Sequence, residues 1–154
     1  MTGHSLTSKI RSGGTDSLAI HCGDFRFQAA FHEFLNQSLN LNGNYDLMVI
    51  PGGPLSLNLF NYLPEYQQAA SKWVRFFAEM HKISRLILIQ HQDCAFYRSM
   101  PFELHSEANL RQRQEQDLRR IKELARKEFP HLSVELYYAG WDATERVTIE
   151  SVLT

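Results

Sequence analysis

The sequence is poor in cysteine, in long apolar runs and in net charge. No apolar stretch approaches the roughly 20 residues that a membrane-spanning helix needs. With 16 basic and 17 acidic residues the formal net charge is −1, which predicts no electrostatic attraction to nucleic acid or to an anionic membrane. There is also no internal repeat, no low-complexity tract and no linker that would divide the chain.

The two cysteines, Cys22 and Cys94, stand far apart in the sequence. A structural disulfide is uncommon in a cytosolic protein, so two thiols raise the question of metal binding or catalysis. Free cysteine also behaves as a small core hydrophobe, so two unrelated buried residues are the alternative interpretation. The neighbouring residues have to decide between the two.

Length and composition are those of an ordinary globular domain. The chain has 154 residues, of which 44% are hydrophobic and 21% charged. Residues 1–16 are polar, rich in Gly, Ser and Thr, and lack the apolar core of a secretory signal. We predict a flexible lead-in over 1–16, a single zinc-binding α/β domain over 17–154 and, by default, a cytoplasmic location.

Short β-rich runs alternate with longer amphipathic segments. Strands are predicted at 17–21, 45–50, 85–90 and 133–138, with an edge strand at 147–152. Between them, helical spacing joins two sets of apolar residues: Phe27, Ala30, Phe31, Phe34 and Leu35, and then Tyr66, Ala70, Trp73, Phe77 and Met80. A longer helix is predicted over 106–129, and Pro130 ends it.

This alternation predicts a three-layer αβα fold with a mainly parallel sheet of four to five strands. Right-handed crossovers place helices on both faces of such a sheet. Ligands bind beyond the carboxyl ends of the strands, where the strand order reverses, and the first and third strands commonly flank that point. Pro51-Gly52-Gly53-Pro54 follows the second strand and is predicted to form a tight turn, since it has no phosphate-loop spacing.

Residues of the types that bind metals stand at the carboxyl ends of these two strands. Cys22 follows the first strand, and His91-Gln92-Asp93-Cys94 follows the third. Two sulfurs and one nitrogen form a typical zinc ligand set with an open fourth position. We therefore predict that Cys22, His91 and Cys94 bind zinc.

A carboxylate and a guanidinium follow the first of these residues, at Asp24 and Arg26. Arginine can hold aspartate in a bidentate pair and so orient one carboxylate oxygen toward the metal or its water. The alternative interpretation is an ordinary salt bridge or a charge that favours the helix N-terminus.

The remaining histidines are not predicted to bind metal. Strand alternation directs His21 to the face opposite Cys22. The others lack ligand-like neighbours: His4, His32, His81, His105 and His131. In the helix 106–129, basic and acidic residues are interspersed, which is typical of a solvated face and not of a nucleic-acid stripe.

The pattern C-x-D-x-R followed by H-x-x-C resembles the zinc signature of the β-carbonic anhydrases. The resemblance implies an α/β fold, one zinc ion per chain held by Cys22, His91 and Cys94, and a dyad of Asp24 and Arg26. Members of that family hydrate carbon dioxide reversibly to bicarbonate by means of a zinc-bound hydroxide. In some members the aspartate instead coordinates zinc and closes the site. A homodimer is also implied.

The sequence departs from the family pattern around the predicted pocket. Pro51-Gly52-Gly53-Pro54 replaces an Arg-Asn-Ala-Gly segment, and Ala95 replaces a glycine. Phe25, Phe96 and Tyr97 are expected to make the pocket more aromatic.

These departures leave other functions open. One is a zinc hydrolase acting on another small heteroallene, such as carbon disulfide or carbonyl sulfide. A second is a non-catalytic protein in which Asp24 closes a structural zinc site. A third is a redox pair of Cys22 and Cys94.

Overall fold

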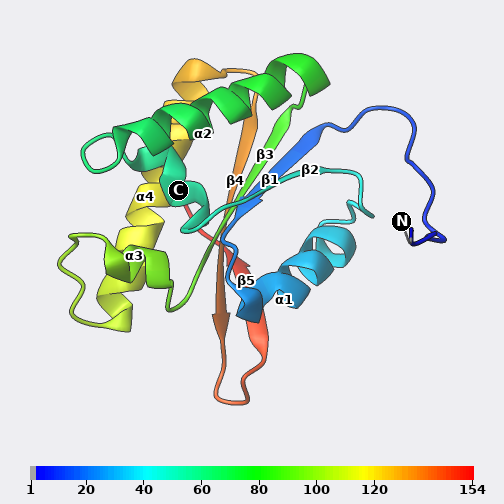
Figure 1. The fold of residues 1–154 in the computed structure, drawn as a ribbon. Helices are drawn as coiled ribbons and strands as arrows, with labels where there is room; N and C mark the ends of the chain where they lie inside the picture. Colours follow the sequence, from blue (N-terminus) through cyan, green and yellow to red (C-terminus); the bar gives the residue numbers. More distant parts are fainter. Residues whose placement is uncertain (1–2) are drawn as a thin grey trace.

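The computed structural model of the chain describes residues 3–154 and contains one five-stranded sheet with helices on both faces (Figure 1). Residues 1 and 2, the first two of the predicted lead-in, lie outside the described residues. The strands are β1 (Ser17–His21), β2 (Asp46–Val49), β3 (Arg85–His91), β4 (Ser133–Trp141) and β5 (Val147–Ser151). Their order across the sheet is β2-β1-β3-β4-β5.

Strands β1 to β4 are parallel, and β5 runs antiparallel to β4 at the edge of the sheet. The α/β class with a mainly parallel sheet, predicted from the alternating pattern, is confirmed. The first and third strands are neighbours in this order, with β2 on one side and β4 on the other. The strand order therefore reverses between β1 and β3, as expected for the point at which a ligand binds.

The helices form the outer layers. They are α1 (Gln28–Glu33), α2 (Pro64–Phe76), α3 (Ala95–Ser99) and α4 (Glu107–Glu128). Figure 1 shows α1 on one side of the sheet and α2 with α4 on the other. The predicted helix after β1 is not uniform, because a 3-10 turn (Phe25–Phe27) precedes α1 and a π-helical turn (Phe34–Ser38) continues it.

Two apolar layers hold the helices against the sheet, and strand alternation divides the strand residues between them. Leu18 and Ile20 of β1 pack in the layer beneath α2 and α4, whereas Ala19 packs in the layer beneath α1. Residues 86–91 of β3 are buried throughout, which explains why this strand has a continuous apolar run instead of alternation.

The predicted apolar face of α2 is partly wrong. Tyr66, Trp73 and Met80 are exposed, although the spacing placed them in the core. The side chains buried along α2 and the π-helical turn that follows it (Phe77–His81) are Gln67, Ala70, Val74 and Ala78. Mostly small side chains let the helix approach the sheet closely, so the larger aromatic residues are left on its outer flank.

Helix α4 agrees with its predicted bounds, and the side chain of Ser106 caps it by accepting a hydrogen bond from the backbone N of Asn109 at 3.1 Å. Its first half contacts the interior of the protein as well, since Leu110 and Gln114 are fully buried. The short helix α3, between β3 and α4, was not predicted.

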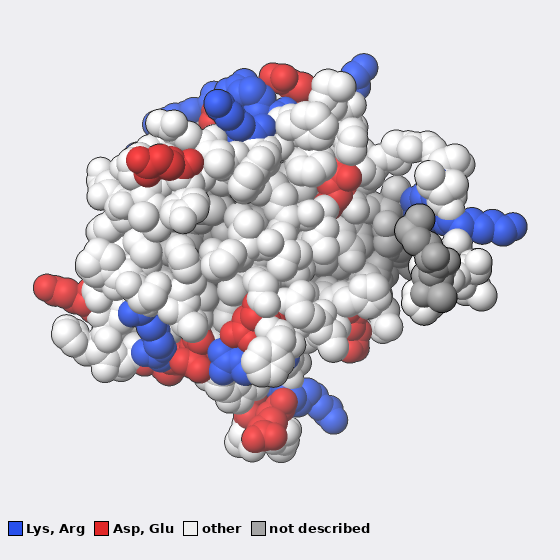
Figure 2. Space-filling model, in the orientation of Figure 1, with Lys and Arg blue, Asp and Glu red and all other residues white. Residues whose placement is uncertain are grey.

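The surface carries acidic and basic side chains side by side, in agreement with the net charge of −1. Figure 2 shows acidic and basic side chains mixed around the rim of one face, with a largely uncharged centre. Among residues 3–154, we find no helix with the length and apolar character required to span a bilayer.

Candidate metal centre

Three potential metal ligands meet at the carboxyl ends of β1 and β3. Cys22, His91 and Cys94 are all buried, and their ligand atoms (the two Sγ and one imidazole nitrogen) all lie within 4.8 Å of one another. The three side chains that the sequence pattern predicts as ligands, from positions far apart, are thus in contact range of a single ion. Such a Cys-His-Cys cluster can bind a metal.

The glycine turn after β2 packs directly against Cys22. Gly52 and Gly53 have φ values of 74° and 50°, in the left-handed region. A Cβ on Gly53 would lie 2.8 Å from the backbone N of Cys22, closer than real Cβ atoms come. The predicted tight turn is present, closed by the backbone N–H of Gly53 donating to Ile50 O at 2.9 Å, and it leads directly into a 3-10 helix (Gly53–Asn58). Gly53 is needed because the backbone passes against β1 here, whereas a Cβ on Gly52 would meet the ring of Phe96 at 2.5 Å.

The orientation of the His91 ring suits a metal ligand. Its Nδ1 lies 2.8 Å from the carbonyl oxygen of Gln92, so Nδ1–H donates there and Nε2 keeps its lone pair. Nε2 is buried and has no hydrogen-bond partner among residues 3–154. A buried nitrogen without a partner is costly unless a ligand satisfies it, so the residues present fit a metal ion.

The two thiols interact with each other. The hydrogen bond with Cys94 lowers the pKa of Cys22 well below its usual value, and His91 acts in the same direction. The same contact with Cys22, together with burial, raises the pKa of Cys94. One thiolate that accepts a hydrogen bond from the other thiol is a favourable starting point for metal binding, because the thiolate is the ligand.

Asp24 and Arg26 form the pair that the sequence suggested. The Nη2 of Arg26 lies 2.7 Å from Oδ2 of Asp24, and Nε contacts both carboxylate oxygens at 3.1 and 3.2 Å. Hydrogen bonds from Arg26 hold the pKa of Asp24 below its usual value. Oδ1 of Asp24 also accepts the backbone N–H of Arg26 at 3.0 Å, so the residue both pairs with arginine and caps the following turn.

A hollow of about 590 Å³ opens beside the cluster. It is lined by Cys22, Gly23, Asp24, Phe25, Arg26, Pro51, Ala95 and Phe96. The expectation of an aromatic wall is met by Phe25 and Phe96 but is wrong for Tyr97. That side chain is fully buried, and its hydroxyl donates to Oδ2 of Asp117 at 3.0 Å.

Several polar residues around the centre were not predicted from the sequence. Gln114 of α4 donates to the backbone oxygen of His91 at 2.8 Å, and Gln28 of α1 donates to that of Cys22 at 3.0 Å. Asp93 of the H-x-x-C turn contacts Arg26. Only the position of Asp93, between two potential ligands, was a signal in the sequence. In contrast, His21 does not contribute to the cluster: its Nδ1 lies 2.9 Å from the carbonyl oxygen of Cys22, and its ring packs against Phe31.

The comparison with known families now decides the kind of protein. A family model described as "Putative carbonic anhydrase" matches residues 13–147. The chain belongs to this family. The predicted resemblance to the β-carbonic anhydrases is therefore confirmed. No match was found among curated proteins.

Solved carbonic anhydrases share the fold at low sequence identity. The wild-type β-carbonic anhydrase CafD of Aspergillus fumigatus matches with a TM-score of 0.56 at 14% identity, over 95% of this chain and 94% of that one. The carbonic anhydrase from Glaciozyma antarctica gives 0.56 at 12% identity, over 91% and 83%. The Streptococcus mutans enzyme gives 0.54 at 16% identity, over 96% and 88%. The chain is thus a divergent member of the carbonic anhydrase-like proteins.

Proposed function

We propose that this protein is a zinc-dependent lyase that converts carbon dioxide and water reversibly to bicarbonate and a proton. The observation that carries the proposal is the buried cluster of Cys22, His91 and Cys94 with the Asp24–Arg26 pair beside it. Membership in the carbonic anhydrase family supports the same reaction.

Cys22, His91 and Cys94 would hold one zinc ion per chain. Thiolate sulfur and imidazole nitrogen are the donors that zinc prefers, and three protein ligands leave a fourth position open for chemistry. Zinc at such a site lowers the pKa of water to about 7, which makes a nucleophile available at neutral pH. The fixed Nδ1–H bond of His91 keeps the ring in the tautomer that this role requires.

Asp24 would orient the attacking water, and Arg26 would hold Asp24. Because the guanidinium lowers its pKa, Asp24 stays ionised at neutral pH and accepts hydrogen bonds instead of carrying protons. The pairing with Arg26 also supports a catalytic over a structural metal site, since a carboxylate held by arginine is not free to close the fourth position.

The test has two parts. Untagged protein is expected to contain about one zinc per chain, as that ligand set implies, and Cys22→Ser is expected to lose it. Zinc-loaded protein is then expected to hydrate carbon dioxide in a stopped-flow assay. Asp24→Ala should lower kcat/KM by about 100-fold, the cost of a misplaced reacting group. Glu123→Gln, an exposed charge change on α4, is the control and should change neither value. Zinc-loaded protein without hydration above background would sink the proposal.

A second substrate class is favoured by the apolar lining of the hollow. Phe25, Phe96 and Pro51 suit a small apolar heteroallene such as carbon disulfide or carbonyl sulfide. Sulfide release from these compounds, at a higher kcat/KM than carbon dioxide hydration, would make them the substrates. No sulfide release would remove this candidate.

We further propose that the protein acts as a homodimer in the cytoplasm and does not bind nucleic acid. Leu47 and Val49 on the edge strand β2 are exposed, and Phe25 beside the hollow is also exposed, which supports contact with a second copy. The largely uncharged centre of the face in Figure 2 is typical of an interface core. Two thiols held close together without a disulfide are typical of a reducing compartment, which supports the cytoplasmic location.

A further inference from the structure

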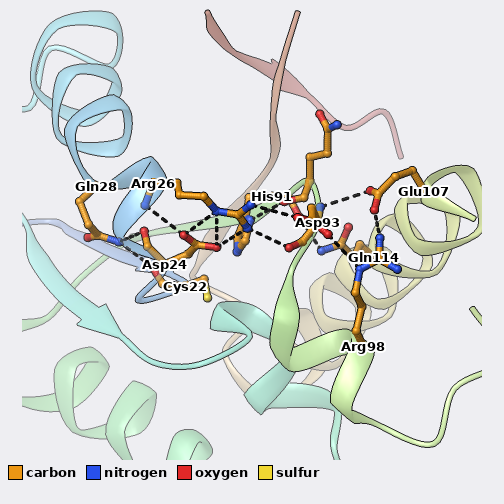
Figure 3. A network of polar contacts seen from close by, with 10 residues as sticks. Cys22, Asp24, Arg26, Gln28, His91, Asp93, Arg98, Glu107 and Gln114 are labelled. Carbon is orange, nitrogen blue, oxygen red and sulfur yellow. Dashed lines mark hydrogen bonds and ion pairs between the residues drawn. The ribbon is translucent and has the colours of Figure 1, made fainter. Parts of the chain in front are cut away.

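Asp93 holds Arg26 from the side opposite Asp24. It lies on the turn between His91 and Cys94, with a left-handed φ of 54°. Its Oδ2 accepts a hydrogen bond from Nη1 of Arg26 at 3.0 Å, and its backbone oxygen accepts one from Nη2 at 3.0 Å. Figure 3 shows the guanidinium of Arg26 between the two carboxylates.

The other side of Asp93 is anchored as well. Its Oδ1 accepts a hydrogen bond from Nε of Arg98 on α3 at 3.0 Å, and Arg98 pairs with Glu107 in the first turn of α4. Glu107 also accepts the backbone N–H of Asp93 at 3.3 Å. Acidic and basic side chains thus alternate in a continuous row of ion pairs (Figure 3). The row begins at Glu107 on α4, passes through the turn between His91 and Cys94, and ends at Asp24.

A single exposed ion pair would be a weak restraint on Asp24. The side chain of Arg26 is 38% exposed, and isolated pairs of this kind contribute little because water screens them and the long side chain loses entropy. When a second carboxylate already fixes the guanidinium, its pairing with Asp24 costs less additional entropy. Networks of this kind are the case in which exposed ion pairs become effective.

We propose that Asp93 is a positioning residue that keeps Arg26 in place, so that Asp24 stays paired with Arg26 and away from the metal. This inference rests on the metal centre of the proposed function but not on carbon dioxide as the substrate. Without the carboxylate of Asp93, Arg26 loses the ion pair at Nη1 and keeps, on that side, only the hydrogen bond to the backbone oxygen of this turn. The more weakly held guanidinium then lets the carboxylate of Asp24 compete for the fourth position on the ion.

Cobalt and azide provide the test. The 154-residue chain is loaded with Co²⁺, whose visible spectrum reports the sulfur ligands. It is then titrated with azide, which needs an exchangeable fourth position. Asp93→Asn and Asp93→Gly both tolerate the left-handed backbone of this turn. Both are expected to raise the azide concentration at half-saturation about tenfold, because the open fraction falls to about a tenth.

Removing Asp24 distinguishes a positioning role of Asp93 from structural damage to the turn between His91 and Cys94. Asp24→Ala combined with either substitution at Asp93 is expected to restore azide binding to the level of Asp24→Ala alone, since no carboxylate competes. Glu123→Gln serves as the charge control and should titrate like the wild type. Wild-type azide binding in both Asp93 variants would overturn the inference. Weak binding that persists in the double variants would also overturn it, because the turn itself would then be distorted.

The outcomes also separate this inference from the proposed function. A wild-type chain that takes up no Co²⁺ would overturn both. The expected azide pattern in a protein that hydrates no carbon dioxide would support the role of Asp93 and overturn the proposed reaction.

Discussion

Gly53 shows how a single residue shapes the candidate metal centre. Its φ of 50° lies in a region that side chains with a Cβ seldom adopt, and a Cβ there would lie 2.8 Å from the backbone of both His21 and Cys22. Both neighbours are backbone atoms at the end of a buried strand, so they cannot move aside cheaply. A larger residue must therefore displace the turn or the strand end that carries Cys22.

Gly53→Ala is expected to lower the free energy of unfolding by about 1–3 kcal/mol, the usual cost of forcing a residue with a Cβ into such a conformation. Urea denaturation of the metal-free chain measures this. Gly23→Ala is the matched control, because its Cβ would meet only Val49 Cγ1 at 3.6 Å, an ordinary contact. Equal stability of the Gly53 variant and the wild type would contradict the role assigned to this glycine.

The sequence predicts some residues of the candidate metal centre and not others, for physical reasons. Cysteine and histidine at the ends of neighbouring parallel strands indicate a metal site, and this pattern predicts Cys22, His91 and Cys94. The residues Asp93, Arg98 and Glu107 form their network only after α3 and the start of α4 are placed in space. In the sequence they are indistinguishable from ordinary surface charges, which are common.

At the scale of elements, an ion pair between β3 and β4 is expected to make the stability of the fold depend on pH. Arg85 of β3 pairs with Glu135 of β4, and the hydroxyl of Tyr137 donates to Oε2 of Glu135 at 2.7 Å. Burial alone would raise the pKa of Glu135, but the hydrogen bonds from Arg85 and Tyr137 outweigh it and lower the pKa. The same surroundings, burial first, raise the pKa of Tyr137 to about 12.

Glu135→Gln is expected to lower the free energy of unfolding at pH 7 by at most about 1 kcal/mol, because the pair is partly exposed and screened. A carboxyl with a depressed folded-state pKa stabilises the fold above its unfolded pKa, which is 4.5 for glutamate here, and loses that contribution as the pH falls through the folded value. The difference between variant and wild type should therefore shrink as the pH falls below 4.5 and disappear once the pH is below the folded-state pKa of Glu135. Urea midpoints at several pH values check this, and a difference independent of pH would contradict it.

For helix α2, the apolar periodicity of the sequence was insufficient to predict which face packs against the sheet. Tyr66, Trp73 and Met80 repeat every seven residues and mark an apolar stripe, yet a neighbouring stripe through Ala70 and Val74 faces the sheet. Periodicity established that a helix forms, but side-chain volume against the sheet decided its rotation. That information lies in the partner surface and not in the helix sequence.

At the scale of the whole molecule, the layer order followed from the alternation of strands and helices. Right-handed crossovers and a parallel sheet leave few arrangements, and the observed order β2-β1-β3-β4-β5 is one of them. The same rules bring the ends of β1 and β3 together, and with them three potential ligands that are distant in sequence. These rules do not predict which surfaces of the protein contact another molecule.

The proposed homodimer can be tested on the β2 edge. The wild type is expected to have twice the chain mass of 17.9 kDa in light scattering after size exclusion. Val49→Glu should shift it toward the monomer, because a charge on an apolar strand edge opposes pairing with another copy.

Leu153→Glu introduces the same charge beyond β5, at the opposite edge of the sheet, and is the control. It should leave the mass of the assembly unchanged. A wild type that is monomeric at all concentrations would contradict the homodimer.

The separation between Cys22 and Cys94 has a kinetic consequence. The two residues are 72 positions apart, and they meet only when β1 and β3 pair in parallel register. Closing so long a loop carries an entropic cost before any contact compensates for it, and non-local parallel pairing is correspondingly slow. We therefore expect the Cys22–His91–Cys94 cluster to form late in folding, and a nascent chain released before β3 is complete has only one of its two cysteines.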